Sequence, residues 1–273
     1  MKSKLIVTSI ILLCSTRIIS GQITDYELPE KLPGKLEIDR SNLQTYLMLT
    51  DYYDYDMEAN FIRKSRVSGS ITWDLNNDTV KWNNVYISET RDFEAPFPKG
   101  QKQLAFENFK YQQSEKALEE ETFAGIPQVD FRLKNLVFDM LGFEVFAYAY
   151  WDSLELNKEF CNHDLNAQVE MGKDGTFENK ELKLTWIGIT EKNKEICAII
   201  KYSQMNGKVN LHLENIKMKG RSHYWGEVYV SLSDKQIEYV SLAEDVITDV
   251  SIKGQPGNFM GYTVRNIKLV KAK

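Results

Sequence analysis

The sequence predicts a mainly β protein: a strongly curved antiparallel sheet or barrel-like meander with repeated β-bulges, and one or two helices packed on or inside it. Three observations predict this fold class. Apolar and polar residues alternate along most of the chain from residue 66 onward. Short turn signals separate the alternating runs, and one apolar pattern recurs around asparagine residues.

The first segment, residues 1–21, has the layout of a secretory signal peptide. Two lysines precede an apolar run that extends to Leu13, and the small residues Ser20 and Gly21 follow. The run is too short for a comfortable membrane span. The sequence therefore predicts a secreted or periplasmic chain with no integral membrane segment after signal removal, and an uncleaved anchor is the alternative.

Charge excludes one class of partner. Removing residues 1–21 deletes three basic residues and no acidic ones, which changes the net charge from −5 to about −8. An acidic chain repels phosphate backbones, so the sequence predicts no nucleic-acid partner. The same charge disfavours anionic membrane surfaces.

Residues 22–65 are predicted to form an N-terminal arm ahead of a single β-rich domain, residues 66–273. Ser41 with Gln44 resembles a capping box, which predicts a short helix near residues 42–50. An acidic, tyrosine-rich cluster follows, and its carboxylates are oxygen ligands of the kind that calcium prefers. The spacing is not that of an EF-hand, so the metal prediction is none, with four weak calcium candidates: Asp51, Asp54, Asp56 and Glu58.

Strands and turns follow each other through the β-rich domain. Alternating runs surround turn signals at residues 76–78, 191–194, 233–235 and 254–257. Asn206-Gly207 is the strongest hairpin signal, because both residues tolerate positive φ. Residues 89–103 predict a loop, and the charged residues 113–122 predict a surface helix.

The apolar segment from Leu136 to Leu154 fits two structures. Met140, Phe143 and Leu154 fall on one face of an amphipathic helix. The aromatic residues that alternate with Ala147 and Ala149 fit a strand equally well. The helix is favoured because the segment is longer than a typical strand.

The recurring pattern places apolar residues at −4, −2, +1 and +3 from an asparagine. In a strand these positions can share one face only if an extra residue is inserted, which is a β-bulge. The spacing predicts a repeat of about 26 residues, one hairpin in length, with missing members near 162, 188 and 241. The five full copies centre on Asn84, Asn108, Asn135, Asn215 and Asn266.

No residue is assigned a catalytic role and no cofactor is predicted, because no nucleophile, zinc or phosphate-binding motif is present. In an oxidising compartment the simplest interpretation of Cys161 and Cys197 is a disulfide. The alternatives are a Cys161 nucleophile beside His163 and a simply buried Cys197. The three histidines lack zinc-ligand spacing.

The leading hypothesis for function is non-enzymatic binding of an apolar small molecule or a protein partner. A curved sheet with a helix inside it resembles, at the level of fold alone, the open-barrel lipid carriers of the bacterial envelope. The alternatives are a secreted hydrolase with paired carboxylates and a structural component of the envelope. The aromatic candidates for lining an apolar cavity are Trp73, Trp82, Phe146, Tyr150 and Trp186.

Overall fold

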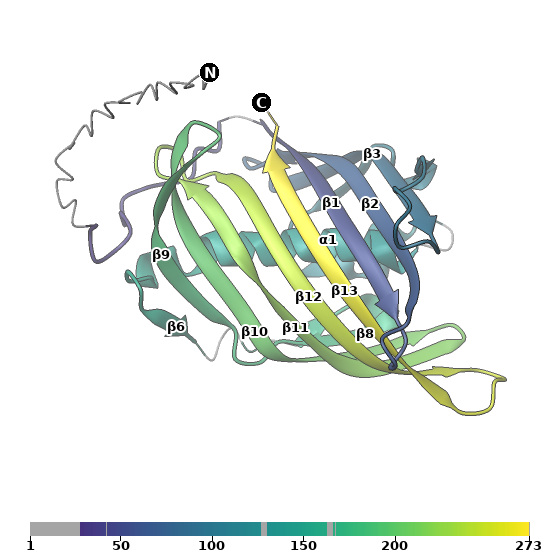
Figure 1. The fold of residues 1–273 in the computed structure, drawn as a ribbon. Coiled ribbons are helices and arrows are strands. Elements are labelled where there is room, and N and C mark those ends of the chain that lie inside the picture. Colours follow the sequence, from purple (N-terminus) through teal and green to yellow (C-terminus); the bar gives the residue numbers. More distant parts are fainter. Residues whose placement is uncertain (1–27, 42, 127–129, 163–165, 167, 273) are drawn as a thin grey trace, which may run out of the picture.

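One large antiparallel sheet and the helix packed on its inner face dominate the molecule (Figure 1). The computed structural model describes residues 28–41, 43–126, 130–162, 166 and 168–272. The sheet is open, because the path of paired strands ends at two unpaired edges. The predicted fold class, a curved antiparallel meander with an associated helix, is confirmed.

The strands follow in chain order: β1 (Leu43–Tyr55), β2 (Phe61–Asp74), β3 (Thr79–Thr90), β4 (Gln101–Lys102), β5 (Phe109–Gln112), β6 (Glu159–Cys161), β7 (Gln168–Glu170), β8 (Gly175–Glu178), β9 (Lys183–Lys192), β10 (Glu195–Leu213), β11 (Ile216–Ser231), β12 (Ile237–Ile252) and β13 (Asn258–Lys271). They pair in the order β4-β3-β2-β1-β13-β12-β11-β10-β8-β7. The early strand β1 and the last strand β13 are therefore neighbours near the middle of the sheet (Figure 1).

The helical segments are α1 (Phe131–Glu144), the π-helical turn η4 (Val145–Ala149) and the 3-10 turns η1 (Leu104–Phe106), η2 (Glu115–Leu118), η3 (Glu120–Phe123), η5 (Trp151–Ser153) and η7 (Gly172–Asp174). The helix predicted over residues 136–154 is thus confirmed as α1, η4 and η5. Asp130 caps α1, since its side chain accepts a hydrogen bond from the Arg132 backbone N–H.

The core lies between α1 and the inner face of the sheet. Alternate strand residues point to this face, and α1 buries Leu133, Leu136 and Phe143 against them. Figure 1 shows α1 crossing behind the long strands. Burying each large apolar side chain contributes about 1.5–3 kcal/mol, so the helix and the sheet stabilise each other.

Two predictions about the N-terminal region are wrong. Residues 43–55 form β1, so there is no helix near 42–50 in the described residues. β1 pairs with both β2 and β13, so residues 43–65, which were predicted as part of the arm, belong mainly to the centre of the sheet. The Tyr46, Met48 and Tyr52 side chains alternate inward, and their burial outweighs a local capping signal.

The Asn206-Gly207 hairpin is also wrong. β10 runs through both residues, and the chain reverses at residues 214–215 instead. Residues 205 and 206 face a single residue of β11, so the pair forms a bulge inside the strand. A Cβ on Gly207 would lie 2.8 Å from the Ser222 carbonyl oxygen. The glycine is therefore needed for close strand approach and not for a turn.

The asparagine repeat predicts the bulge at Asn84 and fails at its other four copies. The β2–β3 register passes from Ser68 opposite Tyr86 to Ser70 opposite Asn83, so Asn84 and Val85 face one residue, Gly69. At the remaining copies Asn108 precedes β5, Asn135 lies in α1, Asn215 occupies the β10–β11 turn, and Asn266 sits in an unbroken register.

The failures have a physical cause. The pattern also occurs in a helix, as at Asn135, where −2 and +1 lie on one side and −4 and +3 on the opposite side. It also fits two strands joined by a two-residue turn, as at Asn215. Of the three missing positions, Gly188 does lie at a bulge, where two residues of β9 face one of β10. Ser241 lies in regular register, and Asn162 directly follows β6.

The bulge at Asn84 predicts how substitutions at this position change the stability of the protein. Asn84 has φ 52°, a left-handed conformation, which costs a β-branched residue about 1–2 kcal/mol. We expect Asn84→Val to lower the free energy of unfolding by about that amount and Asn84→Gly to leave it nearly unchanged. Urea unfolding measures both, with Asn266→Val in regular strand as the matched control. Equal stability of the Val and Gly variants at position 84 would contradict the bulge.

Candidate functional site

A cavity of about 730 Å³ lies between the helical segment α1–η4 and the inner face of the sheet. Its walls include Phe138 and Leu141 from α1, Phe146 from η4 and Leu242 from β12. Exposed residues of the segment around η2 and of β7 also line it, so the mouth lies there. The volume is within the range of small-molecule sites, about 300–1,000 Å³.

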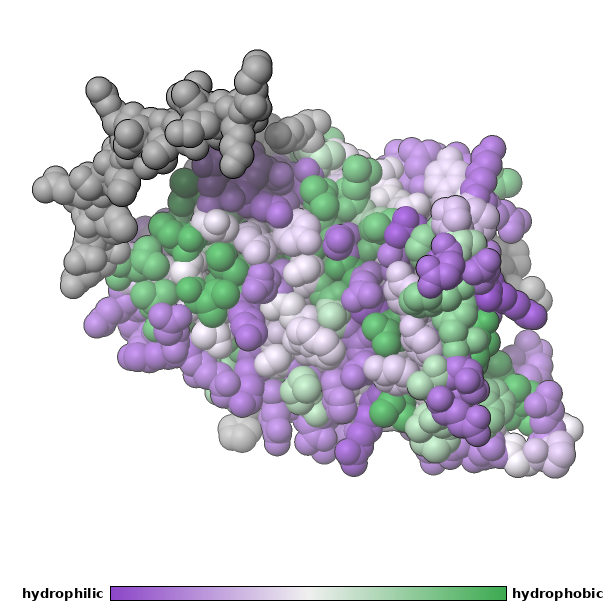
Figure 2. Space-filling model, viewed as in Figure 1, coloured by the Kyte–Doolittle hydropathy of each residue, from purple (hydrophilic) through white to green (hydrophobic). Residues whose placement is uncertain are grey.

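The outer face offers a different surface. Figure 2 shows hydrophilic and hydrophobic residues mixed over this face, with hydrophobic surface over β9 and β10, the strands that carry the exposed Ile187, Ile189 and Ile196. A hollow of about 710 Å³ on the outer face is lined by charged side chains such as Arg66 and Lys268 together with apolar ones such as Leu49 and Trp225. The inner cavity has the more apolar lining of the two.

A buried ionic triad lies at the sheet side of the cavity. Arg265 on β13 donates to Asp139 on α1, with Nη2 2.6 Å from Oδ2, and its Nη1 donates to Glu244 on β12. The side chains of Arg265, Asp139 and Glu244 are 7%, 3% and 8% exposed. Ser222 on β11 donates to the other oxygen of Glu244. Tyr52 on β1 lies under the guanidinium, 5.2 Å from ring centre to carbon.

Sheet register builds this arrangement. Glu244 pairs with Arg265 across β12 and β13, and Arg265 pairs with Tyr52 across β13 and β1. These side chains therefore form one inward-facing row, and Asp139 reaches down to it from the helix. Because buried charges need partners, the triad fixes the position of α1 over the sheet.

Burial sets the protonation chemistry of Asp139. Loss of water around its carboxyl raises the pKa, attraction to Arg265 lowers it and repulsion from Glu244 raises it, and the net pKa of Asp139 is about 7. Desolvation lowers the pKa of Arg265, but the attraction of Asp139 and Glu244 outweighs it and holds the pKa of Arg265 well above its usual value. Asp139 is thus a carboxyl that changes charge near neutral pH inside an apolar cavity.

Aromatic rings stand beside the triad. Phe146 stacks on Tyr202 with ring centres 4.1 Å apart and lies 5.9 Å from Tyr224. Tyr224 pairs with Glu244 across β11 and β12. The hydroxyls of both tyrosines already donate hydrogen bonds, to Ser241 O and to Asn179 Oδ1. Tyr224 lines the cavity, so its ring remains for a ligand, whereas Tyr202 is fully buried beneath Phe146.

The aromatic candidates divide into two groups. Phe146 and Tyr150 line the cavity. Trp73, Trp82 and Trp186 are at most 1% exposed and pack in the core, away from the cavity lining. Alternation along a strand predicts which residues face the inside of the sheet. It does not predict whether such a residue packs in the core or borders a cavity.

The triad was not predicted from the sequence, although the alternation in β12 and β13 carries a signal for it. Glu244 lies in the inward phase of Val240 and Leu242, and Arg265 lies in the phase of Ile267 and Leu269. A charged residue in an inward position of an alternating strand predicts a buried partner. The partner cannot be assigned from spacing, since Asp139 is 126 residues from Arg265.

The weak calcium candidates lie on β1 and the β1–β2 turn, outside the cavity. Asp51 receives two hydrogen bonds from Arg66, at 2.6 and 2.7 Å, and Asp54 receives one from Arg63 at 2.7 Å. Asp56 accepts from Asn60, whose side chain lowers the pKa of this carboxyl. Glu58 lies beside it in the turn. These contacts already occupy the carboxylates that a cation would need.

The predicted disulfide does not form, because Cys161 and Cys197 are both free thiols. Cys161 lies opposite Lys183, which pairs with Ser203, six residues along β10 from Cys197. At about 3.3 Å per residue this is about 20 Å, beyond disulfide reach. The alternative partner of Cys161, His163, lies outside the described residues.

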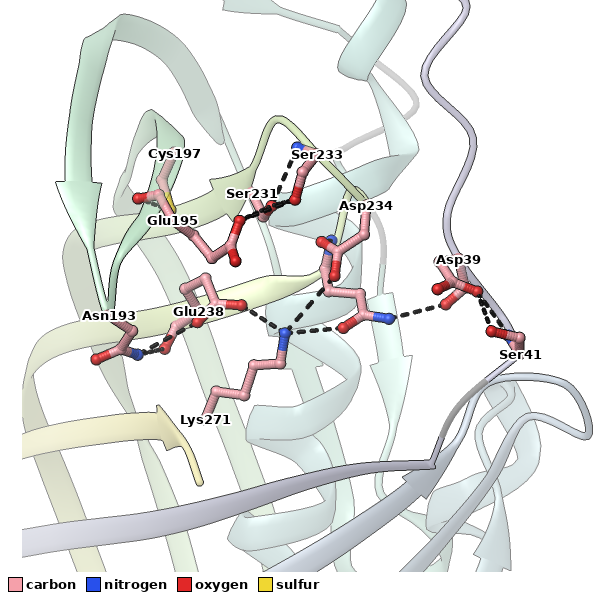
Figure 3. Close-up of polar contacts among 11 residues, drawn as sticks. Asp39, Ser41, Asn193, Glu195, Cys197, Ser231, Ser233, Asp234, Glu238 and Lys271 are labelled. Atoms are coloured by element: carbon pink, nitrogen blue, oxygen red, sulfur yellow. Dashed lines mark hydrogen bonds and ion pairs between the residues drawn. The ribbon is translucent and has the colours of Figure 1, made fainter. Parts of the chain in front are cut away.

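A second polar cluster fastens the end of the sheet to the arm (Figure 3). Lys271 on β13 contacts Glu238 and the Gln236 side-chain oxygen, and Gln236 donates to the Asp39 carbonyl oxygen at 2.9 Å. Cys197 lies in the same region, where burial raises the pKa of its thiol to about 12. A thiol that stays protonated is a poor nucleophile, so Cys197 offers no activated thiol.

The predicted signal peptide, residues 1–21, lies outside the described residues. Within the described part of the chain, none of the helices combines the length and the hydrophobicity needed to cross a bilayer.

Comparison with known proteins gives only distant similarities. The sequence matches no protein-family model and no curated protein. Lipovitellin, described for its lipid–protein interactions, aligns at a TM-score of 0.42 and 11% identity over 85% of this chain, which spans only 25% of that one. Salmonella typhi OmpF in complex with daunomycin aligns at 0.22, with 8% identity over 86% of this chain and 99% of that one. A DUF1329 family protein from Desulfovibrio piger aligns at 0.16, with 7% identity over 85% and 87%. All three TM-scores are below 0.5, so these similarities indicate no function for this chain.

Proposed function

We propose that this protein is an exported, non-enzymatic binding protein that holds an apolar ligand between α1–η4 and the inner face of the sheet. One observation carries the proposal: an apolar and aromatic cavity of about 730 Å³ inside the curl of the sheet. Cavities of this size and lining are the usual sites for small apolar molecules. Export to the periplasm or outside the cell rests on the signal-peptide layout of residues 1–21.

Two further features support binding. The cavity wall includes the π-helical turn η4, and such turns occur frequently at functional sites. Gly142 on α1 also lines the cavity, and its missing side chain leaves space between Asp139 and Phe146. A glycine inside a helix costs about 1 kcal/mol relative to alanine, so the open space comes at the expense of helix stability.

The triad argues against the paired-carboxylate hydrolase. Asp139 and Glu244 face the same cavity, as such an enzyme would need. Arg265 stands between them, however, and bonds to both. The Ser222 hydroxyl donates a hydrogen bond to the second oxygen of Glu244. Glu244 is therefore fully engaged and has no oxygen available to attack a sugar or to activate water.

Filling the cavity tests the proposal. A Cβ at Gly142 would meet only the Phe146 ring, at 3.6 Å, so Gly142→Leu is expected to fold and to place its side chain in the ligand space. We expect the neutral fluorescent probe N-phenyl-1-naphthylamine to bind the unaltered protein and to bind Gly142→Leu at least about tenfold more weakly. Fluorescence titration measures both affinities.

The matched control is Gly125→Leu, at an exposed site where an added Cβ meets nothing within 4 Å. This variant is expected to bind the probe like the unaltered chain. Failure of the unaltered protein to bind the probe, or equal binding by Gly142→Leu, would refute the proposed function.

A further inference from the structure

The charge of the cavity lining restricts the chemistry of the ligand. Among the described lining residues five are acidic and two are basic. Glu119 and Glu170 stand near the mouth together with Lys116, and Asp139 lies deep inside. The other basic group, Arg265, is already shared by two carboxylates. The local field therefore favours a positively charged ligand group and opposes a negatively charged one.

Asp139 presents an oxygen to this space. Its Oδ2 accepts from Arg265 at 2.6 Å, and no other side chain in the described part of the chain donates to this carboxyl. The side chain is 3% exposed and borders the cavity. A carboxylate oxygen that has no donor from the protein needs a ligand or water to satisfy it. Oδ1 is thus an acceptor placed beside the ligand space.

The surroundings of Asp139 fit one kind of cation. Phe146 follows it by seven residues along the continuous helical segment, which puts both on one face. Tyr224 comes from the neighbouring strand, next to Glu244, and its ring lies 5.9 Å from that of Phe146. Aromatic faces combined with carboxylates are the usual recognition surface for quaternary ammonium groups.

We infer that the ligand is a cationic amphiphile whose apolar body fills the cavity and whose ammonium group lies against Asp139, beside the Phe146 and Tyr224 rings. This inference rests on the proposed function and specifies the ligand class. A fatty carboxylate does not fit, because it would add a third carboxylate to the two that share Arg265.

The inference predicts a specific pH dependence. Asp139 faces Arg265 from β13, Glu244 from β12, Tyr52 from β1, Tyr111 from β5 and Tyr202 from β10, with Glu144 at the end of its own helix and Tyr224 from β11 beside Glu244. Burial raises the pKa of each of these tyrosines, so they stay neutral. Asp139, with a pKa of about 7, is mostly neutral at pH 6 and mostly charged at pH 8. Ammonium affinity is therefore expected to rise by about tenfold between these pH values.

Three probes that share a twelve-carbon chain and differ in head group test the inference. Dodecyltrimethylammonium, dodecanol and dodecanoate, each below its micelle concentration, compete with N-phenyl-1-naphthylamine for the full-length protein. At pH 8 the ammonium probe is expected to bind at least about tenfold more tightly than the other two, and this advantage shrinks by about tenfold at pH 6. Asp139→Asn is expected to bind all three with similar affinity and no pH dependence.

Asp245→Asn is the matched control. Asp245 follows Glu244 on β12, on the outer face, where it pairs with His223 at 3.2 Å, so its replacement should leave the preference and the pH dependence intact. Tighter binding of dodecanoate, or equal affinities at both pH values, would overturn the inference but leave the proposed function standing. No binding of any probe would overturn both. If Asp139→Asn does not fold, the ranking and pH dependence in the unaltered chain still decide.

Discussion

Replacing Arg265 with methionine is expected to destabilise the protein by about 3–5 kcal/mol. The substitution leaves Asp139 and Glu244 as buried carboxyls without a cation, and breaking a buried ion pair from one side carries this cost. The loss is a large part of the total stability of an ordinary domain, about 5–15 kcal/mol. Denaturant unfolding at neutral pH measures it.

The pH dependence of that loss is a sharper test. Without Arg265 the attraction that lowers the pKa of Asp139 disappears, so its folded-state pKa rises further above the unfolded value. A carboxyl with a raised folded-state pKa contributes its stability at low pH and loses it as pH rises through that pKa. The free energy of unfolding of Arg265→Met is therefore expected to lie closer to that of the unaltered protein at pH 5 than at pH 8. A loss that is independent of pH would show that the carboxyls are not the cause.

Two further variants complete this experiment. Adding Asp139→Asn and Glu244→Gln to Arg265→Met removes the unpaired charges, and most of the lost stability is expected to return, because a buried network deleted as a whole costs much less than one half-deleted. Arg63→Met is the control on the surface. Arg63 pairs with Asp54 while 47% exposed, and such pairs contribute about 0–1 kcal/mol.

The strands could be predicted from the sequence because their determinants are local. Alternation located β2, β3 and β9 to β13, and the residues between them marked most turns correctly. Asn193 and Lys194, for example, both have positive φ in the tight β9–β10 turn. Length alone separated the helix of residues 136–154 from a strand.

The cavity could not be predicted because its determinants are not local. Asp139, Glu244 and Arg265 come from one helix and two strands, and only pairing of β12 with β13 under α1 brings them together. The Asn206-Gly207 error has the same origin. That pair is compatible with a turn, but the pairing of β10 with β11 over nearly its whole length, and with β8 just after the pair, outweighs the local preference.

Truncation of Trp82 to alanine is expected to cost about 3–5 kcal/mol and to leave ligand affinity unchanged. Trp82 has no exposed surface, and its ring lies over Gly69, where an added Cβ would approach it to 3.2 Å. Removing a fully buried tryptophan loses its apolar burial and leaves a void in the core. Guanidinium unfolding gives the stability, and N-phenyl-1-naphthylamine titration gives the affinity of the folded protein. Trp82→Phe, which removes less volume, keeps the affinity measurable if the alanine variant does not fold.

Tyr150→Ala is the complementary variant, because Tyr150 borders the cavity and is only partly buried, with its ring 5.1 Å from Phe160. It is expected to lower probe affinity severalfold while costing less stability than Trp82→Ala. If instead truncation at position 82 changed the affinity and truncation at 150 did not, the ligand would lie on the tryptophan side of the sheet. The two variants therefore separate side chains that stabilise the fold from those that contact the ligand.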